Sequence, residues 1–393
     1  MTREKAQRLR TELGTLTVFR RLLSDPVISA LTDHLEAPTE AAYAELVSRL
    51  YESGGSLARH IEDICLNDEN VYVRCIGRGE TPPAHIEACV RSELGVLQRA
   101  ALLSSAELQG LLSWQGFLPD FPAELIDLAD SFRHRVENIG RYGYGFYAKN
   151  RMFYIDSGGR IAPVKNPDRV SLEDLAGYEA QRQIVIDNTR ALLAGRPASN
   201  ILLTGDAGTG KSSAIKAVAN ALFDEGLRII ELRKDQLAEI PGILDELSSN
   251  PLKFVLFIDD LSFLKDDDNF NALKAVLEGS VSAKSENVVI YATSNRRHII
   301  KEKFSDREGD EVHRNDTMQE LVSLSERFGI HVSFSKPNKE TYLNIVRHLA
   351  EKSGVKLSGD ALALEAERFA LERGGRSARI ARQLVDILIS SGR

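Results

Sequence analysis

Residues 200–213 read NILLTGDAGTGKSS, and this stretch decides the fold. The apolar run at 201–204 has the pattern of a strand, GDAGTGKS at 205–212 is a full match to the GxxxxGK[ST] phosphate-loop pattern, and the run from Ser212 to Gly226 has the pattern of a helix. The glycines let the backbone curl so that its N–H groups point at phosphate oxygens, and the positive end of the following helix adds to the attraction. A chance glycine turn with an exposed lysine would not need this strand-loop-helix context. The stretch therefore predicts a nucleotide phosphate site.

Two side chains of the loop have specific expected tasks. Lys211 is expected to reach the β- and γ-phosphates, and the Ser212 hydroxyl is expected to ligate Mg²⁺. The residues expected to surround the nucleotide phosphates are Gly205, Asp206, Ala207, Gly208, Thr209, Gly210, Lys211, Ser212 and Ser213.

Two other strand ends supply the polar groups that phosphate chemistry needs. Residues 254–260 read FVLFIDD, where Asp259 is expected to hold Mg²⁺ through water and Asp260 to face the attacking water. Residues 291–297 read YATSNRR, where Asn295 is expected to hydrogen-bond the attacking water or the phosphate. The alternatives are a buried strand with a polar exit and an asparagine that ends a strand in a turn.

The region around these motifs alternates between short apolar runs and helical patterns. Strands alternating with helices imply a mostly parallel sheet that is covered on both faces. Residues 338–393 have only helical patterns and predict a small helical lid, and the polar residues 301–316 predict a surface loop. The predicted strands are 201–204, 228–232, 254–258, 288–293 and 331–334.

The first part of the chain has a different sequence pattern, mainly that of helices. Residues 39–51 and 124–136 carry apolar residues at the spacing of amphipathic helices. Two β-rich runs within 145–164 flank DSGG and predict a hairpin. The sequence thus predicts three parts: a mainly helical N-terminal domain at 1–165 that ends in the hairpin, an α/β core at 166–337, and the lid at 338–393.

Composition narrows the class of protein. The 57 acidic and 50 basic residues give a formal charge of -7, which argues against a surface that is basic overall but leaves a local basic groove open. The three cysteines suit a reducing cytoplasm and fit no common zinc pattern, so we expect no structural metal. The N-terminus lacks the apolar segment of a signal peptide, and no uncharged run approaches the ~20 apolar residues that span a bilayer. We expect a cytoplasmic protein without a membrane partner.

Together these motifs resemble the AAA+ superfamily of P-loop ATPases. In this resemblance residues 205–212 are the Walker A motif, residues 254–260 are the Walker B motif, and Asn295 is sensor 1. LAGYE at 175–179 looks like the segment that cups the adenine. The resemblance assigns to that segment Gly177 and Tyr178.

The same resemblance singles out three arginines. SLSERFGI at 323–330 looks like the helix end that presents an arginine finger, which makes Arg327 the candidate. GGRSARIARQL at 374–384 resembles the lid helix that carries sensor 2, where Arg379 aligns best and Arg376 is the second choice. In this superfamily the finger usually points into a neighbour's site, which implies a ring or filament of identical subunits. On the residues alone, the favoured interpretation of Arg327 is a surface arginine at a helix end, paired with Glu326 or bonded to terminal carbonyls.

The sequence is more similar still to one bacterial AAA+ family, domain of unknown function 815. The strings GYE, GDAGTGKSS, IDDLSF, LKAVLEGS, YATSNRRH and SLSERFG, in that order, look like its members and extend over about residues 150–393. The resemblance implies an AAA+ fold with ATP and Mg²⁺ as cofactors. It supplies no settled cellular role, because the family itself lacks one.

One departure from most AAA+ motors concerns the rate of hydrolysis. Most of them end Walker B in Asp-Glu, whereas the second acid here is Asp260, which is one methylene shorter. The Asp-Asp ending is similar to that of replication initiators and some helicase loaders, which act as ATP-dependent switches. Because a general base must lie within hydrogen-bond reach of its water, we expect slow basal turnover.

Three functions remain open at this point. The first is an ATPase that remodels a partner protein, which the N-terminal domain would bind, and that works as a homo-oligomer. The second is an initiator-like or helicase-loader switch, which would bind DNA or RNA with a steep dependence on salt. The third is a monomeric P-loop enzyme such as a kinase, in which Arg327 would have no role. The sensor and finger motifs disfavour the third function, and the acidic charge weighs weakly against the second.

Overall fold

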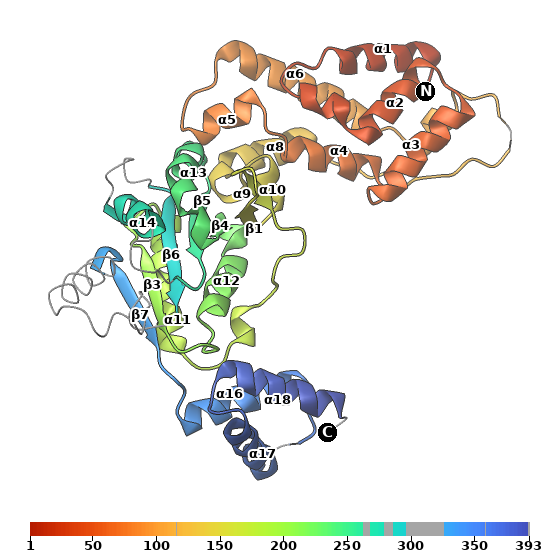
Figure 1. Ribbon diagram of the computed structural model, residues 1–393. Helices are drawn as coiled ribbons and strands as arrows, with labels where there is room; N and C mark the ends of the chain where they lie inside the picture. Colours follow the sequence, from red (N-terminus) through yellow and green to blue (C-terminus); the bar gives the residue numbers. More distant parts are fainter. Residues whose placement is uncertain (115, 262–267, 279–285, 296–325, 358, 392–393) are drawn as a thin grey trace. The chain divides into compact units, whose positions relative to one another are not determined.

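The N-terminal helices and the phosphate-loop sheet belong to different compact units (Figure 1). The computed structural model describes residues 1–114, 116–261, 268–278, 286–295, 326–357 and 359–391. The chain divides into a first unit at Met1–Lys149 and a second unit at Asn150–Arg393. The predicted surface loop at 301–316 lies outside the described residues.

The first unit is helical and has its own apolar core. Polar side chains start several of its helices, because Thr2, Asp25 and Thr39 each accept a hydrogen bond from a backbone N–H of the following first turn. Its helices are α1 (Arg3–Gly14), η1 (Arg20–Ser24), α2 (Pro26–Glu36), α3 (Glu40–Glu52), α4 (Leu57–Leu66), α5 (Val71–Gly77), α6 (Ala84–Ala101), α7 (Ser105–Gln109), α8 (Leu128–Glu137), α9 (Ile139–Tyr142) and α10 (Phe146–Lys149).

One of the two helices predicted in this unit is shorter than expected. Residues 39–51 form α3, as predicted, but the helix predicted at 124–136 begins only at Leu128. The side chain of Gln98 donates to the Ile126 carbonyl over 2.8 Å and accepts from the Leu128 N–H over 2.7 Å. These two bonds hold the residues before α8 in an extended form, so the apolar spacing at 124–127 does not become helical.

The second unit is built on a seven-stranded sheet with the order β2-β1-β4-β5-β6-β3-β7. All neighbouring strands pair in parallel except β1 and β2, which pair antiparallel. The strand that precedes the phosphate loop, β3, pairs with β6 on one side and with β7 on the other. The strands are β1 (Met152–Ile155), β2 (Ile161–Pro163), β3 (Ile201–Gly205), β4 (Leu227–Leu232), β5 (Lys253–Ile258), β6 (Val288–Ser294) and β7 (Ile330–Phe334).

The predicted hairpin exists, but it lies in this sheet and not at the end of the N-terminal domain. Strand β1 pairs in parallel with β4, with Met152 opposite Ile229, and Met152 packs in the core of the second unit. The predicted boundary at residue 165 is therefore corrected to the junction of Lys149 and Asn150. The reason is a long-range one, because β4 offers a parallel edge that the nearby sequence of the hairpin does not reveal.

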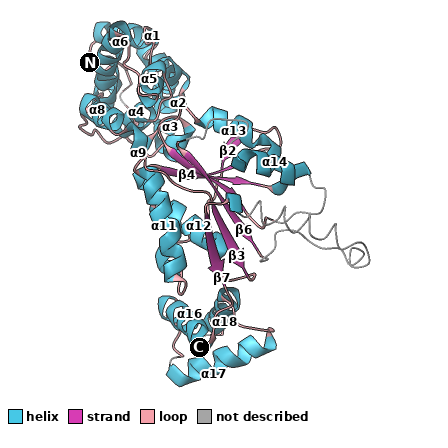
Figure 2. Cartoon of the chain, turned by 90° about the vertical axis from the view of Figure 1, so that its left-hand side faces the viewer, coloured by secondary structure: helices cyan, strands magenta, loops and turns pink. Residues whose placement is uncertain are grey.

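Helices cover both faces of the sheet (Figure 2). Helices α11 (Glu179–Leu193) and α12 (Lys211–Ala221) lie on one face, and α13 (Ile240–Leu247) and α14 (Asp268–Glu278) lie on the other. The described part of the second unit also contains three short 3-10 helices. They are η2 (Leu172–Asp174), η3 (Phe223–Glu225) and η4 (Lys234–Glu239).

A lid of three helices follows β7 and has a small core of its own. It consists of α16 (Lys339–Lys352), α17 (Gly359–Glu372) and α18 (Ala378–Ser390). Helix α16 is attached to the segment between β2 and α11, because Lys352 pairs with Asp174 and His348 lies 2.7 Å from the Glu173 carbonyl. The predicted architecture is confirmed: a mostly parallel sheet with helices on both faces, a helical lid and a mainly helical N-terminal region. Among the described helices, none is long and apolar enough to cross a membrane.

Candidate nucleotide site

The phosphate loop begins where β3 leaves the sheet at Gly205. This residue has φ +142°, and a Cβ built there would lie 2.0 Å from the carbonyl oxygen of Phe334 on β7. Only glycine permits both this conformation and this approach. At the other end of the loop, Gly210 has a left-handed conformation and precedes α12 as its N-cap. The local sequence therefore folds as the GxxxxGK[ST] pattern predicts.

Lys211 is the first residue of α12, directly after the loop, and is buried. Its Nζ donates to the carbonyl oxygens of Gly205 over 2.8 Å and of Asp206 over 2.9 Å, and to Oδ1 of Asn295 over 3.0 Å. Burial lowers the pKa of Lys211, and neighbouring carboxylates, Asp206 foremost, act in the opposite direction. The ammonium group is thus held by the loop and by the end of β6, within reach of an anion that binds the loop.

Ser212 and Asp259 meet although they come from different segments. The Ser212 hydroxyl donates to Oδ1 of Asp259 over 2.6 Å. The same carboxylate oxygen accepts the Thr293 hydroxyl over 2.5 Å and the Asp260 N–H over 3.1 Å. The two residues that the sequence predicts as the metal side of the site therefore lie side by side.

Asp260 and Asn295 are also in contact. Nδ2 of Asn295 donates to Oδ1 of Asp260 over 2.7 Å, while Oδ1 of the same amide accepts the bond from Lys211. Asn295 therefore links the lysine of the loop to the second acid of Walker B. Asp260 has φ +52°, a left-handed conformation that is uncommon for residues other than glycine.

The predicted adenine segment lies between strand β7 and the lid. The Tyr178 hydroxyl donates to the Ser335 carbonyl over 2.6 Å, and its ring packs on Phe334. Burial, with a smaller effect from Asp206, raises the pKa of Tyr178 to about 12, so this hydroxyl stays protonated. At Gly177 a Cβ would lie 3.2 Å from Thr341 on α16. This segment contacts the lid and is close to the first residues of the loop.

The two sensor 2 candidates lie in different surroundings. The backbone N–H of Arg379, near the start of α18, donates to the Gly208 carbonyl over 3.2 Å, and its side chain is exposed. Arg376 instead binds both carboxylate oxygens of Glu367 within the lid, over 2.9 and 2.7 Å. This geometry favours Arg379, the first choice of the sequence reading, as the lid arginine nearer to the loop.

The finger candidate is not brought to this cluster. Arg327 forms an ion pair with Glu278 at the end of α14 in its own chain. The structure therefore assembles Lys211, Ser212, Asp259, Asp260 and Asn295 through hydrogen bonds and leaves Arg327 in a separate contact.

The oxygen groups present fit Mg²⁺ better than a metal that needs a protein cage. The described residues contain no group of three or more His, Cys, Asp and Glu side chains that could hold a metal. Mg²⁺ is usually bound by one or two carboxylates together with waters and substrate phosphates. The Ser212 hydroxyl and the Asp259 carboxylate, 2.6 Å apart, suit that mode of binding.

Sequence reasoning missed Thr293. This buried residue contacts both Walker B acids, whereas the sequence pattern predicts only that it belongs to the strand before Asn295. The available signal is the strand period of two, because Asn295, directly after β6, is two residues beyond Thr293 and would extend the same side of the strand.

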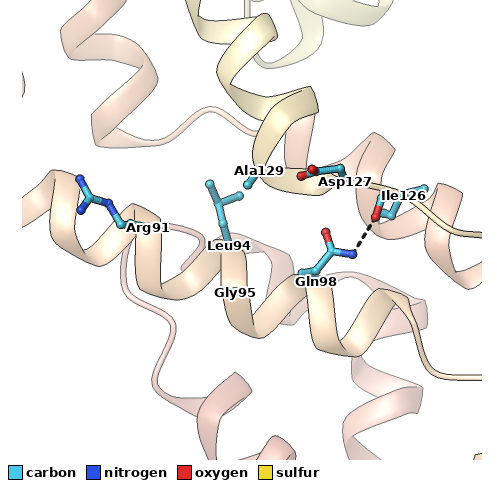
Figure 3. A pocket seen from close by; sticks show the side chains of 7 residues that line it. All are labelled: Arg91, Leu94, Gly95, Gln98, Ile126, Asp127 and Ala129. Atoms are coloured by element: carbon cyan, nitrogen blue, oxygen red, sulfur yellow. Dashed lines mark hydrogen bonds between the residues drawn. The ribbon is translucent and has the colours of Figure 1, made fainter.

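A separate groove of about 400 Å³ lies in the first unit, between α6 and the start of α8 (Figure 3). Its lining includes Arg91, Gln98 and Asp127. None of the predicted site residues lines it, and the Gln98 bond to Ile126 that borders it serves the local fold.

One family model and several solved structures are similar to this chain. The model of a family described as "Protein of unknown function (DUF815)" matches residues 148–392. A comparison with curated proteins found no match. Among solved structures the chain is similar to the Thermotoga maritima RuvB Holliday junction branch migration motor, with 18% identity and a TM-score of 0.38, over 55% of this chain and 63% of that one. A lysine-to-arginine mutant of the same motor matches with 18% identity and a TM-score of 0.39, over 57% of this chain and 67% of that one. The first match thus spans less than two thirds of the motor's length.

Proposed function

Because the chain belongs to the DUF815 family, whose match includes the whole AAA+ sheet and lid, we propose that it binds ATP with Mg²⁺ and hydrolyses it to ADP and phosphate. One observation carries the proposal. The ends of β3, β5 and β6 bring together a lysine, a serine, two aspartates and an asparagine in one hydrogen-bonded set. Ligands of parallel α/β sheets bind at the carboxyl ends of the strands, which is where this set lies.

Each group of the set has a task in hydrolysis. Lys211 would exchange its bonds to loop carbonyls for bonds to phosphate oxygens, and Ser212 and Asp259 would hold the metal. A water then attacks the γ-phosphorus, the bond to the bridging oxygen of ADP breaks, and Asp260 and Asn295 orient the water. The step balances as ATP and water giving ADP and phosphate.

The lid supports a role in which nucleotide changes the shape of the protein. Helix α18 contacts the loop through the bond from Arg379 to the Gly208 carbonyl. A nucleotide that binds the loop meets this contact, so lid position and nucleotide state are expected to be coupled. We propose that the protein works in this way as a homo-oligomer in which Arg327 acts on a neighbouring site.

The first unit supports a protein partner as the object of this shape change. Trp114, Phe117 and Leu125 lie in the connection before α8 and are 57%, 91% and 92% exposed. Contiguous exposed apolar patches are typical of protein contacts, and this connection exposes three large apolar side chains. We therefore propose remodelling of a partner protein that the first unit binds.

Nucleotide binding by paired lysine variants tests the proposal. We expect Lys211→Ala to weaken ATP binding at least about a hundredfold, because the site loses the ammonium group that is expected to bind the phosphates. Lys216→Ala is the matched control, since Lys216 lies on the same helix and pairs with Glu231 at 3.2 Å. The measurement is calorimetric titration of ATP with Mg²⁺, followed by an assay of phosphate release.

The outcomes separate the possibilities. Wild-type binding and hydrolysis that Lys216→Ala keeps and Lys211→Ala loses support the proposal. A wild-type protein that binds no ATP, or a Lys211→Ala variant that binds it normally, overturns the proposal. Phosphate release that requires DNA or RNA would instead favour a nucleic-acid switch.

A further inference from the structure

We propose that Thr293 is a positioning residue for the metal side of the site, whose hydroxyl orients the Asp259 carboxylate and fixes the backbone of Asp260. The inference rests on the proposed function and adds to it a residue that the sequence motifs do not mark. Thr293 is a positioning residue because its hydroxyl bonds the two acids that are expected to hold the metal and face the water.

The hydroxyl of Thr293 is both a hydrogen-bond donor and a hydrogen-bond acceptor. It donates to Oδ1 of Asp259 over 2.5 Å, and it accepts the backbone N–H of Asp260 over 3.0 Å. A hydroxyl can do both at once, whereas valine, which has the same shape, can do neither. The side chain is 2% exposed, so water cannot take over these two bonds freely.

These bonds restrict how the Asp259 carboxylate can turn. Oδ1 receives three donors, from Ser212, Thr293 and the Asp260 N–H. When Ser212 ligates Mg²⁺, its hydroxyl would no longer donate to Oδ1 of Asp259. Of the two side-chain donors to this oxygen, the Thr293 hydroxyl then remains. Partners that orient a metal-binding group in this manner change metal affinity about 10–100-fold when they are removed.

The same residue also fixes the exit of β5. Asp260 has φ +52°, and directly after it the Leu261 N–H donates to the Thr293 carbonyl over 2.7 Å. Thr293 therefore holds the chain on both sides of the left-handed residue, with its side chain before and its backbone after. Loss of the hydroxyl removes one of these two holds at the point where Asp260 must face the water.

The test compares how much Mg²⁺ tightens ATP binding in four full-length proteins. They are the wild type, Thr293→Val, Thr293→Ser and Thr189→Val. Thr189 is a matched control, since it is a buried threonine of the same unit whose hydroxyl bonds Val185 and Tyr291. ATP affinity is measured by calorimetry with Mg²⁺ and with EDTA, and thermal unfolding checks folding. Thr293→Ala, which removes the same hydroxyl with less bulk, replaces the valine variant if that variant does not fold.

We expect Thr293→Val to reduce the tightening by Mg²⁺ about tenfold. Its ATP affinity in EDTA should stay within about twofold of the wild type, because no phosphate contact is lost. Thr293→Ser and Thr189→Val should keep the full Mg²⁺ effect. An unchanged Mg²⁺ effect in Thr293→Val, with or without a lower melting temperature, would show a purely structural role and overturn the inference. A wild type that binds no ATP would instead reject the proposed function itself.

Discussion

Asp260 shows why the second Walker B acid is short in this chain. Its backbone has φ +52°, a left-handed conformation that aspartate and asparagine adopt more readily than glutamate. The Asp-Asp ending therefore agrees with the local backbone and not only with a slow chemical step. A glutamate would extend the carboxylate by one methylene but would favour this conformation less.

The variant Asp260→Asn tests the negative charge of residue 260, because it removes the charge and keeps the shape of the side chain. Asp260→Asn keeps a residue that accepts the left-handed conformation and an oxygen that can receive the Asn295 amide, but it removes the negative charge. We expect ATP affinity within about twofold of the wild type and phosphate release reduced about 10²–10⁴-fold, the contribution of general acid–base catalysis. Single-turnover phosphate release, with binding measured alongside, provides the check.

An exposed acid of the same unit provides the comparison. Asp245→Asn on α13 removes one negative charge at an exposed position and should leave both quantities unchanged. Turnover at the wild-type rate in Asp260→Asn would mean that this carboxylate does not orient the attacking water.

At this scale the sequence motifs predicted the members of the site and not all of its contacts. The GxxxxGK[ST] pattern led to Lys211 and Ser212, and the strand ends led to Asp259, Asp260 and Asn295. The bonds that Thr293 makes depend on the register of β5 against β6, with Phe257 opposite Tyr291, which no local pattern encodes. The motifs also could not show that Arg327 pairs with Glu278.

At the scale of elements, one buried histidine makes the packing of α2 sensitive to acid. His34 is fully buried, and its Nε2 lies 3.3 Å from the Leu108 carbonyl on α7. Burial lowers the pKa of His34 below its usual 6.5, so the imidazole is neutral in the folded unit. As the pH falls below about 6.5, the unfolded chain binds a proton at this residue before the folded chain does. Its contribution to stability is therefore complete above that pH and decreases as the pH falls through and below it.

We expect the first unit to lose stability between pH 7.5 and 5.5, by at most about 1.4 kcal/mol per pH unit from this residue. Trp114, the single tryptophan of the chain, lies in this unit and reports its unfolding by fluorescence in guanidinium. We compare the free energy of unfolding of the wild type and of His34→Phe over this pH range. The variant should lose the pH dependence that His34 contributes. His85→Phe, at an exposed position, should behave like the wild type. Equal pH dependence in the wild type and His34→Phe would contradict the assignment.

Elements were predicted best where one apolar face decides them. The α3 helix and the strands around the phosphate loop follow from spacing alone. Spacing failed at 124–127, because the Gln98 side chain, distant in sequence, binds the backbone there and delays α8. A pattern of apolar residues does not record a polar side chain that arrives from another helix.

For the whole molecule, assembly is the property that Arg327 tests. The side chain pairs with Glu278 of its own chain, so a role in a neighbour's site requires this ion pair to be exchanged on assembly. We expect ATP hydrolysis per subunit to rise with protein concentration and Arg327→Ala to lower the assembled rate about 10³-fold, as for other arginine fingers. The assay is Mg²⁺-dependent phosphate release over a wide range of protein concentration.

The control is an exposed arginine of the lid. Arg347 bonds Asn344 one turn away at 2.8 Å, and Arg347→Ala should retain the rise with concentration. Hydrolysis that is independent of concentration, with Arg327→Ala equal to the wild type, would indicate a monomeric P-loop enzyme.

The division of the whole chain was predicted only in part. Sequence texture distinguishes a helical beginning, an α/β core and a helical end, and the structure has these three regions. The texture could not assign the hairpin, because its place is set by the pairing of β1 with β4, whose residues lie far along the chain. The pattern of apolar and polar residues predicts the local structure of a segment. Which sheet a strand joins depends on pairing with strands far away in the sequence.

The hairpin also determines how one border of the sheet meets other proteins. Strand β2 forms that border and has only three residues, the last of which is Pro163. Proline has no N–H to offer, and short border strands of this kind discourage a further strand from joining. Copies of this protein therefore have no template at this border for building a continuous intermolecular sheet.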